Sequence, residues 1–469
     1  MELKNREYKM GEAKKRGDFN QRKEVAINNK IDKFVNSYFE FDDQITINLR
    51  KGYEFLLENI HPSDWANRRS TIISYLNNRP DKYEKPNSRI RYVPDEIGWY
   101  IFLCEEFFKN PSTTEYIQFS RIAPFISCLG SKVELLVKIR NIGDKVKELV
   151  KKYKSNPDGL LFEIIIASSY LEQGFNVEFI NETGEEKTPD LSIEKNNIKY
   201  YVECKRLSRR TDYAQNEQIA FLKAWKNSEN ILLREFKNYW FNFEIKTDIL
   251  NKNVDDFNDI LLKVKKKNGY AFYEDENYKI IGEKKDLNAI NNYLSENYVK
   301  ANSFILSKLL GGDLVYPNCE RTHTIHGNTS QMIGAVAPVL GTYVENISLF
   351  FGVTRSFSSL ISKEKKAREI TSHVREALTQ VVKYKPAIIH IMFEAMESDG
   401  VEFIRWMKIN DKMDNVILKD LDDHTSVKIH RIQHIESIDM MFDMLETTKT
   451  WGQEIDSNLF DIIPNGNLL

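Results

Sequence analysis

The chain has 469 residues, a formal net charge of −2 and an ordinary globular balance of 41% hydrophobic and 29% charged residues. This length is enough for about three domains of roughly 150 residues each, and the composition excludes a largely disordered protein. The near-neutral charge excludes a surface that is basic throughout, as a non-specific nucleic-acid binder would have. Any affinity for a polyanion must therefore be local or supplied by a partner.

The cysteines are scattered without the spacing of disulfide pairs or metal ligands, which is typical of reduced thiols in a cytoplasm. They are Cys104, Cys128, Cys204 and Cys319. Residues 1–23 are charged throughout and do not resemble a secretory signal. The most apolar long run, residues 332–353, contains Pro338 and Glu345, so we interpret it as a buried core segment. We expect a cytoplasmic protein without a membrane span.

Residues 1–154 show a series of amphipathic helical patterns and predict an α-helical N-terminal domain. Ser63 or Asp64 is the expected N-cap of one helix, and residues 133–153 are predicted to form one long final helix. Such a domain could bind a protein partner, form a homo-oligomer or sense a target, and the sequence favours none of these over the others.

The next segment, residues 157–173, predicts a helix that is apolar on nearly every side and therefore packed in an interior. Asn156 is the expected cap, and Gly174 is expected to end the helix. Glu163 is the only charge between Asp158 and Glu172. A buried carboxylate is costly unless a cation or hydrogen-bond donor meets it, so we expect a partner for Glu163.

A strand is predicted at 175–180, followed by a hairpin formed by 190–194 and 198–205 around a turn at 195–197. Because side chains alternate along a strand, Glu203 and Lys205 are expected on one face, and Val202 and Cys204 on the core face. Asp190 begins the paired strand, beside Glu203. Two carboxylates at such a short distance raise each other's pKa unless a cation lies between them.

Pro189-Asp190 followed by Glu203-Cys204-Lys205, with Glu163 upstream on a helix, resembles the PD-(D/E)XK nuclease superfamily, whose core is like that of restriction endonucleases. The resemblance implies an α/β core with a mixed sheet flanked by helices, and an α+β fold overall once the N-terminal helices are included. The alternative is a surface hairpin with an incidental Glu203–Lys205 salt bridge, which leaves Glu163 unexplained.

The resemblance also implies a role for each residue of the motif. Asp190 and Glu203 would ligate Mg²⁺ or Mn²⁺ together with the backbone carbonyl of Cys204, and Glu163 would hold the cation through water or support a second one. Lys205 would orient or help to deprotonate the attacking water and offset charge in the transition state.

Arginines follow the motif directly, and we predict that Arg206, Arg209 and Arg210 contact nucleic-acid phosphates. Two other basic runs, at 263–267 and 363–368, are interpreted as solvated helix faces. Gln215 and Gln218 could reach the site, although surface amides are the better interpretation.

The remaining elements predict one nuclease domain, residues 155–395, with an insertion at about 246–362. Helix 214–237 and strand 239–245 would complete the core, and helix 370–382 with the apolar strand 387–394 would extend its sheet. The insertion is predicted to hold helical residues 250–267, strands in 270–281 and a helix over 287–310. Residues 396–469 would form a C-terminal α+β extension with strands at 416–421 and 427–432 and a helix at 440–445.

Two histidine groups carry no chemistry in this interpretation. Cys319, His323 and His326 resemble zinc ligands in spacing but lack a fourth ligand, so a polar loop is preferred. The C-terminal histidines have no nucleophile placed with them; they are His424, His430 and His434.

The sequence therefore predicts an Mg²⁺-dependent endodeoxyribonuclease, acting as a regulated effector in antiphage defence or restriction. The same metal chemistry would also permit cleavage of RNA. A third hypothesis is a catalytically silent nuclease fold that binds partners, although the presence of all four catalytic residues argues against it.

Overall fold

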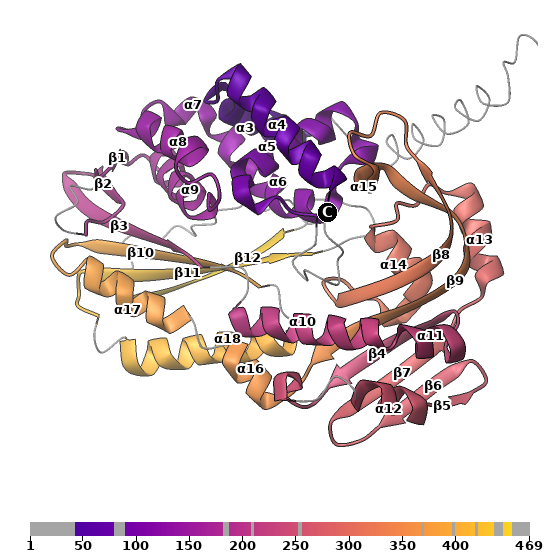
Figure 1. The fold of residues 1–469 in the computed structure, drawn as a ribbon. Helices are drawn as coiled ribbons and strands as arrows, with labels where there is room; N and C mark the ends of the chain where they lie inside the picture. Colours follow the sequence, from indigo (N-terminus) through magenta and orange to yellow (C-terminus); the bar gives the residue numbers. More distant parts are fainter. Residues whose placement is uncertain are drawn as a thin grey trace, which may run out of the picture.

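The computed structural model describes residues 43–78, 90–181, 187–207, 211–251, 256–366, 370–395, 399–417, 421–435 and 444–452. They form an α+β fold with two six-stranded mixed sheets and many helices. In Figure 1 the N-terminal helices lie above the first sheet, and the second sheet lies to the right. No helix in the described ranges is long and apolar enough to cross a membrane.

The N-terminal region is helical, as the amphipathic patterns predict. Its α-helices are α3 (Gln44–Glu58), α4 (Pro62–Asn77), α5 (Glu96–Lys109), α6 (Tyr116–Ser131), α7 (Val133–Leu136) and α8 (Ile142–Lys151). Two local predictions are wrong. The N-cap of α4 is His61, whose ring accepts the Ser63 N–H. The single helix expected at 133–153 is broken, because Asn141 takes a left-handed conformation with φ 65° between α7 and α8.

Two glycines allow α3 and α6 to pack backbone against backbone. A Cβ atom on Gly130 would lie 1.7 Å from the Asn48 carbonyl oxygen, and one on Gly52 would lie 2.1 Å from the Ile126 carbonyl oxygen. Any side chain at either position would push the two helices apart. α6 is buried along most of its length between α3, α5 and α9 (Asp158–Glu172).

The first sheet carries the acidic hairpin. Its strands, in spatial order, are β1 (Asn176–Phe179), β2 (Leu191–Lys195), β3 (Ile198–Arg206), β10 (Ala387–Glu394), β11 (Thr425–His434) and β12 (Met444–Gly452). β3, β10 and β11 are parallel, and the other neighbours are antiparallel. The predicted hairpin is confirmed, and Asn196 and Asn197 form its turn with positive φ. The predicted extension by 387–394 is confirmed as well.

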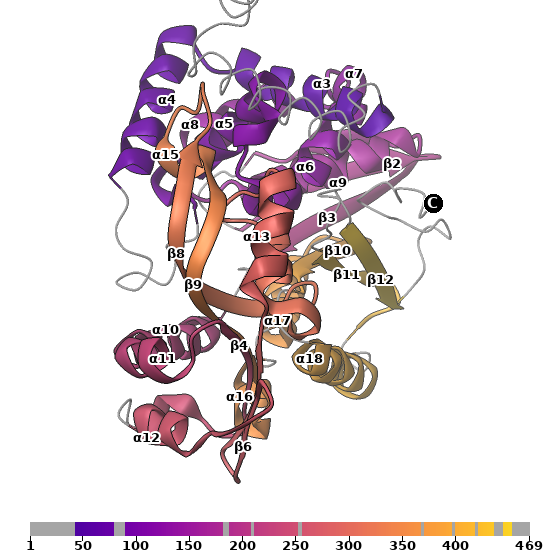
Figure 2. The same ribbon diagram turned by 90° about the vertical axis from the view of Figure 1, so that its right-hand side faces the viewer.

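Helices cover both faces of this sheet (Figure 2). α9 packs on the face that carries Val202 and Cys204, while α17 (Ile370–Gln380) and α18 (Asp399–Lys412) pack around Ile389 and Ile391 on the other. α9 begins at Asp158, with Pro157 rather than Asn156 at the N-cap position, and Gly174, with φ +85°, follows its C-terminus as expected.

The second sheet is built from the middle of the chain. In spatial order its strands are β5 (Lys265–Lys267), β6 (Tyr270–Glu274), β7 (Tyr278–Lys284), β4 (Tyr239–Ile245), β9 (Thr342–Phe357) and β8 (Glu320–Gln331). The expectation that strand 239–245 completes the nuclease core is wrong, because β4 pairs with β7 and β9. One face packs an aromatic cluster against α10 (Asp212–Asn227), α11 (Glu229–Glu235) and α12 (Asp256–Lys263).

Other predicted elements are also corrected. The helix expected to reach residue 267 ends at Lys263, and the lysines that follow form β5 rather than a helix face. The helix at 287–310 is two helices, α13 (Leu287–Glu296) and α14 (Phe304–Gly311). The loop expected at 319–326 lies largely in β8.

The C-terminal strand expected at 427–432 is β11 of the first sheet. Residues 416 and 417, expected in a strand, belong to the π-helix Met413–Ile417, and 418–420 lie outside the described residues. Met444 and Leu445, expected in a helix, begin strand β12, and 440–443 also lie outside.

A chain of buried polar side chains crosses the first sheet beneath α9. The Tyr170 hydroxyl lies 2.8 Å from His390 Nε2, His390 Nδ1 lies 2.8 Å from His430 Nε2, and His430 Nδ1 lies 2.9 Å from Glu446 Oε1. Burial, and then the neighbouring His430, hold the pKa of His390 well below its usual value. These hydrogen bonds give His430 a structural role in the sheet.

A buried ionic network joins the N-terminal helices to the first sheet. The Arg121 guanidinium on α6 donates to both carboxylate oxygens of Glu394 on β10, at 2.8 and 3.0 Å, and to Asp158 at 3.1 Å. Tyr100 donates to Asp158 at 2.6 Å, and Arg206 on β3 pairs with Glu394. Buried charges persist only when paired in this way, so the network fixes how the helices dock on the sheet.

We predict that Arg121→Ala lowers the free energy of unfolding by about 3–5 kcal/mol, because it leaves the buried Glu394 carboxylate short of a partner. Lys51→Ala, which removes the exposed pair with Glu134, is the control and should cost less than about 1 kcal/mol. Urea unfolding followed by circular dichroism measures both. Equal effects of the two substitutions would contradict a docking role for the network.

Candidate active site

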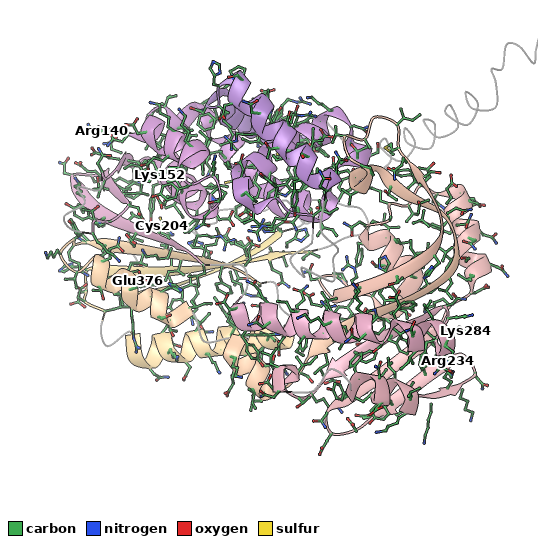
Figure 3. All side chains as sticks on the ribbon, in the orientation of Figure 1. Arg140, Lys152, Cys204, Arg234, Lys284 and Glu376 are labelled. Atoms are coloured by element: carbon green, nitrogen blue, oxygen red, sulfur yellow. The ribbon has the colours of Figure 1, made fainter. Side chains whose placement is uncertain are left out.

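The four predicted catalytic residues come from neighbouring segments. Glu163 lies on α9, Asp190 directly precedes β2, and Glu203 and Lys205 lie on β3. Figure 3 labels Cys204 and Glu376 in this region, at the left of the molecule. Leu191 pairs with Val202, so Asp190 lies at the level of Glu203. The Cys204 backbone N–H donates to Asp190 Oδ2 at 2.7 Å and holds this carboxylate against β3.

Glu203 and Lys205 point to the same face of β3 and form an ion pair. Lys205 Nζ lies 2.5 Å from Glu203 Oε1, and the Glu203 side chain is 0% exposed. Gln380, the last residue of α17, donates to Glu203 Oε2 at 3.0 Å and accepts from Lys205 Nζ at 3.1 Å. The same amide also donates to the Thr188 carbonyl at 2.9 Å. One glutamine therefore fixes both charged groups relative to each other.

Glu163 lies on α9, which packs against β3 on the face opposite Glu203 and Lys205. Burial raises the pKa of Glu163 well above its usual value, the nearby Asp190 and Glu203 raise it further, and Lys145 and Lys205 oppose the shift. The electrostatic influence of Asp190, Glu203 and Lys205 on this carboxyl indicates that α9 brings Glu163 near the hairpin, and we call these four residues the acidic cluster. The hydrogen-bond donor expected for Glu163 is not found among the described residues, so its carboxyl group has no such partner there.

The cluster carries an excess of negative charge for its degree of burial. Burial, and then Asp190, raise the pKa of Glu203 to about 8, although Lys205 acts in the opposite direction. Burial acts to lower the pKa of Lys205, but Glu203 and Asp190 outweigh it and the net pKa is raised. Lys205 is therefore an ammonium group at neutral pH. Burial also raises the pKa of Cys204, which keeps its thiol protonated.

The donor chemistry of the cluster fits a hard divalent cation. Asp190, Glu203 and Glu163 offer carboxylate oxygens, the ligands that Mg²⁺ and Mn²⁺ prefer. Within the ranges that the structure describes, no three acidic, histidine or cysteine side chains are already gathered as a metal-binding group. A cation would compete with the Asp190–Cys204 hydrogen bond and the Glu203–Lys205 pair for the same oxygens.

The structure describes only one of the three arginines that were predicted to bind phosphate. Arg206 lies in the buried network with Glu394, and its side chain is only 3% exposed, so it is not presented to solvent. Its position on β3 explains this, because alternation turns Arg206 to the face opposite Glu203 and Lys205. Arg209 and Arg210 lie outside the described residues.

The other candidates lie elsewhere. Gln218 is buried on α10, with its amide nitrogen 3.5 Å from Glu320 Oε2 of the second sheet. Cys319 is buried just before β8, the strand that carries His323 and His326. No group of metal ligands is found around them in the described part of the chain.

Gln380 is the site residue that the sequence analysis missed. Nothing in its local context separates it from other glutamines near the end of a helix. The available signal was indirect: helix 370–382 and strand 387–394 were expected to join the sheet of the acidic hairpin, which brings the end of that helix beside β3. Glu376, one turn earlier, raises the pKa of both Glu203 and Lys205 through its charge.

We predict that the protein loses stability as pH rises from about 4.5 toward about 8. The raised pKa of Glu203 means that the folded state keeps a proton that the unfolded state has already released in this window. The loss is on the order of 1 kcal/mol per pH unit at most. Urea unfolding in chelator at several pH values measures it.

Glu203→Gln should flatten this pH dependence, and Glu163→Gln should flatten it further, because each removes a carboxyl group with a raised pKa. Glu194→Gln, on the exposed side of the neighbouring strand β2, is the matched control and should leave the slope as it is. An unchanged slope in the Glu203→Gln protein would show that Glu203 ionises normally in the fold.

Comparisons with family models, with curated proteins and with solved structures give no match for this chain. The function therefore has to be argued from the cluster itself.

Proposed function

We propose that the chain is a metal-dependent nuclease of the PD-(D/E)XK superfamily that hydrolyses phosphodiester bonds of DNA. One observation carries the proposal: Asp190 is held against β3, Glu203 and Lys205 form an ion pair on the same strand, and Glu163 on the adjacent helix α9 feels the charges of all three. A buried group of acids around one ammonium is destabilising for the fold, and a bound cation relieves it.

Asp190 and Glu203 would hold Mg²⁺ or Mn²⁺, with the Cys204 carbonyl as a further oxygen and Glu163 acting directly or through water. A bound cation of this kind supplies polarisation of the scissile phosphate and stabilisation of the leaving oxygen. The protein supplies a hydrogen-bonded frame: Gln380 and the Cys204 N–H hold two of the carboxylates in place.

The raised pKa of Lys205 favours one of its two possible roles. A group that is an ammonium at neutral pH donates hydrogen bonds and does not accept a proton. Lys205 would therefore orient the attacking water and offset the charge that develops on the phosphate. Deprotonation of the water would fall to another group or to solvent.

DNA is proposed as the substrate from the resemblance to restriction endonucleases. RNA is the alternative, because the cluster acts on the phosphate and has no group committed to the sugar. The N-terminal helices offer a surface for a protein partner or a second copy, as expected of a regulated effector in antiphage defence or restriction. A silent scaffold is the third possibility, and the retention of all four side chains in one cluster argues against it.

We predict that the purified protein cuts plasmid or single-stranded DNA with Mg²⁺ or Mn²⁺ and is inactive in chelator. Asp190→Ala and Lys205→Ala should each reduce the rate by about 100-fold or more, because each removes charge from the reacting phosphate's surroundings. Gel assays on plasmid, single-stranded DNA and RNA measure this.

Glu194→Ala and Lys199→Ala are matched controls on the same hairpin and should retain full activity. Cleavage without metal, or full activity of both site variants, would overturn the proposed mechanism. If RNA alone were cut, the site would stand and the DNA assignment would fall.

We predict that Gln380→Met, which keeps the volume but removes the amide, lowers the cleavage rate by roughly 10- to 100-fold, the usual effect of losing a group that orients a catalytic residue. The melting temperature in chelator should fall by a few degrees, because the buried Glu203 loses a hydrogen bond, so the rates are compared well below melting. Thr379→Ala is the control, because the Thr379 hydroxyl bonds only its own helix, at the Arg375 carbonyl. Wild-type activity of Gln380→Met would show that Glu203 and Lys205 hold their geometry without it.

A further inference from the structure

One face of the second sheet is left open over its first three strands. The side chains of Tyr270, Phe272 and Ile281 on this face are 62%, 49% and 37% exposed. Lys265 and Lys267 of β5 are also exposed. We name these five residues the lysine–aromatic face.

The strand register places the five side chains together. Lys265 pairs with Phe272, which in turn pairs with Ile281, and Lys267 pairs with Tyr270. Directly paired residues share a face, and residues two apart along a strand lie about 7 Å from one another on that face. Two aromatic rings therefore lie side by side, each with a lysine across from it on β5. On its other side Tyr270 faces Glu283 of β7, whose charge is paired with Lys285 at 2.6 Å.

The rest of the sheet does not have this character. The opposite face, with Ala271 and Ile280, is buried in the aromatic cluster beneath α10, α11 and α12. On the same face but farther along the sheet, Trp240 and Phe350 are covered by α13 and α14. The lysine–aromatic face is the uncovered remainder, and Figure 2 shows β6 beyond the lower end of α13.

The charges on β5 divide between the two faces. Lys266 points to the covered side, where it pairs with Glu235 at 3.1 Å and lies over the Phe236 ring. Lys265 and Lys267 have no ion-pair partner among the residues that the structure describes. Lysines on an edge strand often prevent it from pairing with a strand of another chain. That role alone does not account for the two exposed rings directly across from them.

We propose that the lysine–aromatic face binds single-stranded nucleic acid, with bases stacked on Tyr270 and Phe272 and phosphates on Lys265 and Lys267. Exposed aromatic rings beside lysines are the combination that binds single strands without sequence preference. A duplex is not favoured, because its bases already stack on one another. The choice of nucleic acid as the occupant rests on the proposed nuclease function; the face itself does not.

The face is remote from the acidic cluster. Cys204 beside the cluster and Lys284 on β7 lie at opposite ends of the molecule in Figure 3. A strand held at both places must span the protein, so the face would anchor long substrates and have no effect on short ones. Its contribution would appear in affinity for long strands and not in the rate of bond cleavage.

The test measures binding of a fluorescent 30-mer of thymidylate by anisotropy, in chelator, with full-length protein carrying Asp190→Ala so that the strand stays intact. Adding Tyr270→Ala and Phe272→Ala should weaken binding about tenfold or more. Adding Lys265→Ala and Lys267→Ala instead should reduce the slope of log affinity against log salt by about 1.4, or 0.7 for each lost phosphate contact.

Tyr293→Ala on α13 is the matched control, because this exposed ring lies on another element, and it should leave binding unchanged. An abasic 30-mer should not distinguish the aromatic variant from the parent. Retained melting temperatures establish that the variants fold.

Unchanged binding by the aromatic variant overturns the proposal, and so does an equal loss of affinity for a duplex. Self-association that depends on Tyr270, without binding of the 30-mer, assigns the face to protein contacts and overturns it as well. Absence of binding by the parent also overturns it. Metal-dependent plasmid cleavage judges the nuclease function separately, so the two proposals fail independently.

Discussion

The structure depends on how three carboxylates are accommodated near the end of one sheet. Glu203 is wholly buried and meets a single ammonium, while Asp190 and Glu163 add negative charge beside it. Such a group opposes folding unless it is hydrogen-bonded, protonated or bound to a cation. The backbone N–H of Cys204 and the amide of Gln380 supply the hydrogen bonds. The rest of the first sheet and its helices hold these donors in place.

The two faces of β3 separate chemistry from architecture. On one face Glu203 and Lys205 meet Gln380, and on the other Arg206 enters the buried network that docks the N-terminal helices. A change in that docking would therefore be felt by the same strand that carries the acidic cluster. This connection gives the helical region a physical route to the site, in addition to the charge of Lys145 on α8, which acts on Glu163.

Local patterns predicted the parts of the site that lie close together in sequence. Periodicity predicted helix α9, and alternation and turn chemistry predicted the hairpin and its asparagine turn. The hairpin in turn predicted that Asp190 lies beside Glu203. Long-range pairing was harder. Strand 239–245 has the apolar character of either sheet, and only its partners, β7 and β9, decide its place. Gln380 gave no local signal, because its role comes from tertiary contacts alone.

The parallel pairing of β3 with β10 has a consequence for synthesis. Residues 207–386 separate the two strands, and the second sheet is formed within that interval. The hairpin therefore leaves the ribosome long before Gln380 and β10 exist to support it. Because long-range strand pairing forms late, a growing chain lacks an organised cluster until most of its length has been translated. The proposed nuclease activity would thus be withheld from incomplete chains by topology alone.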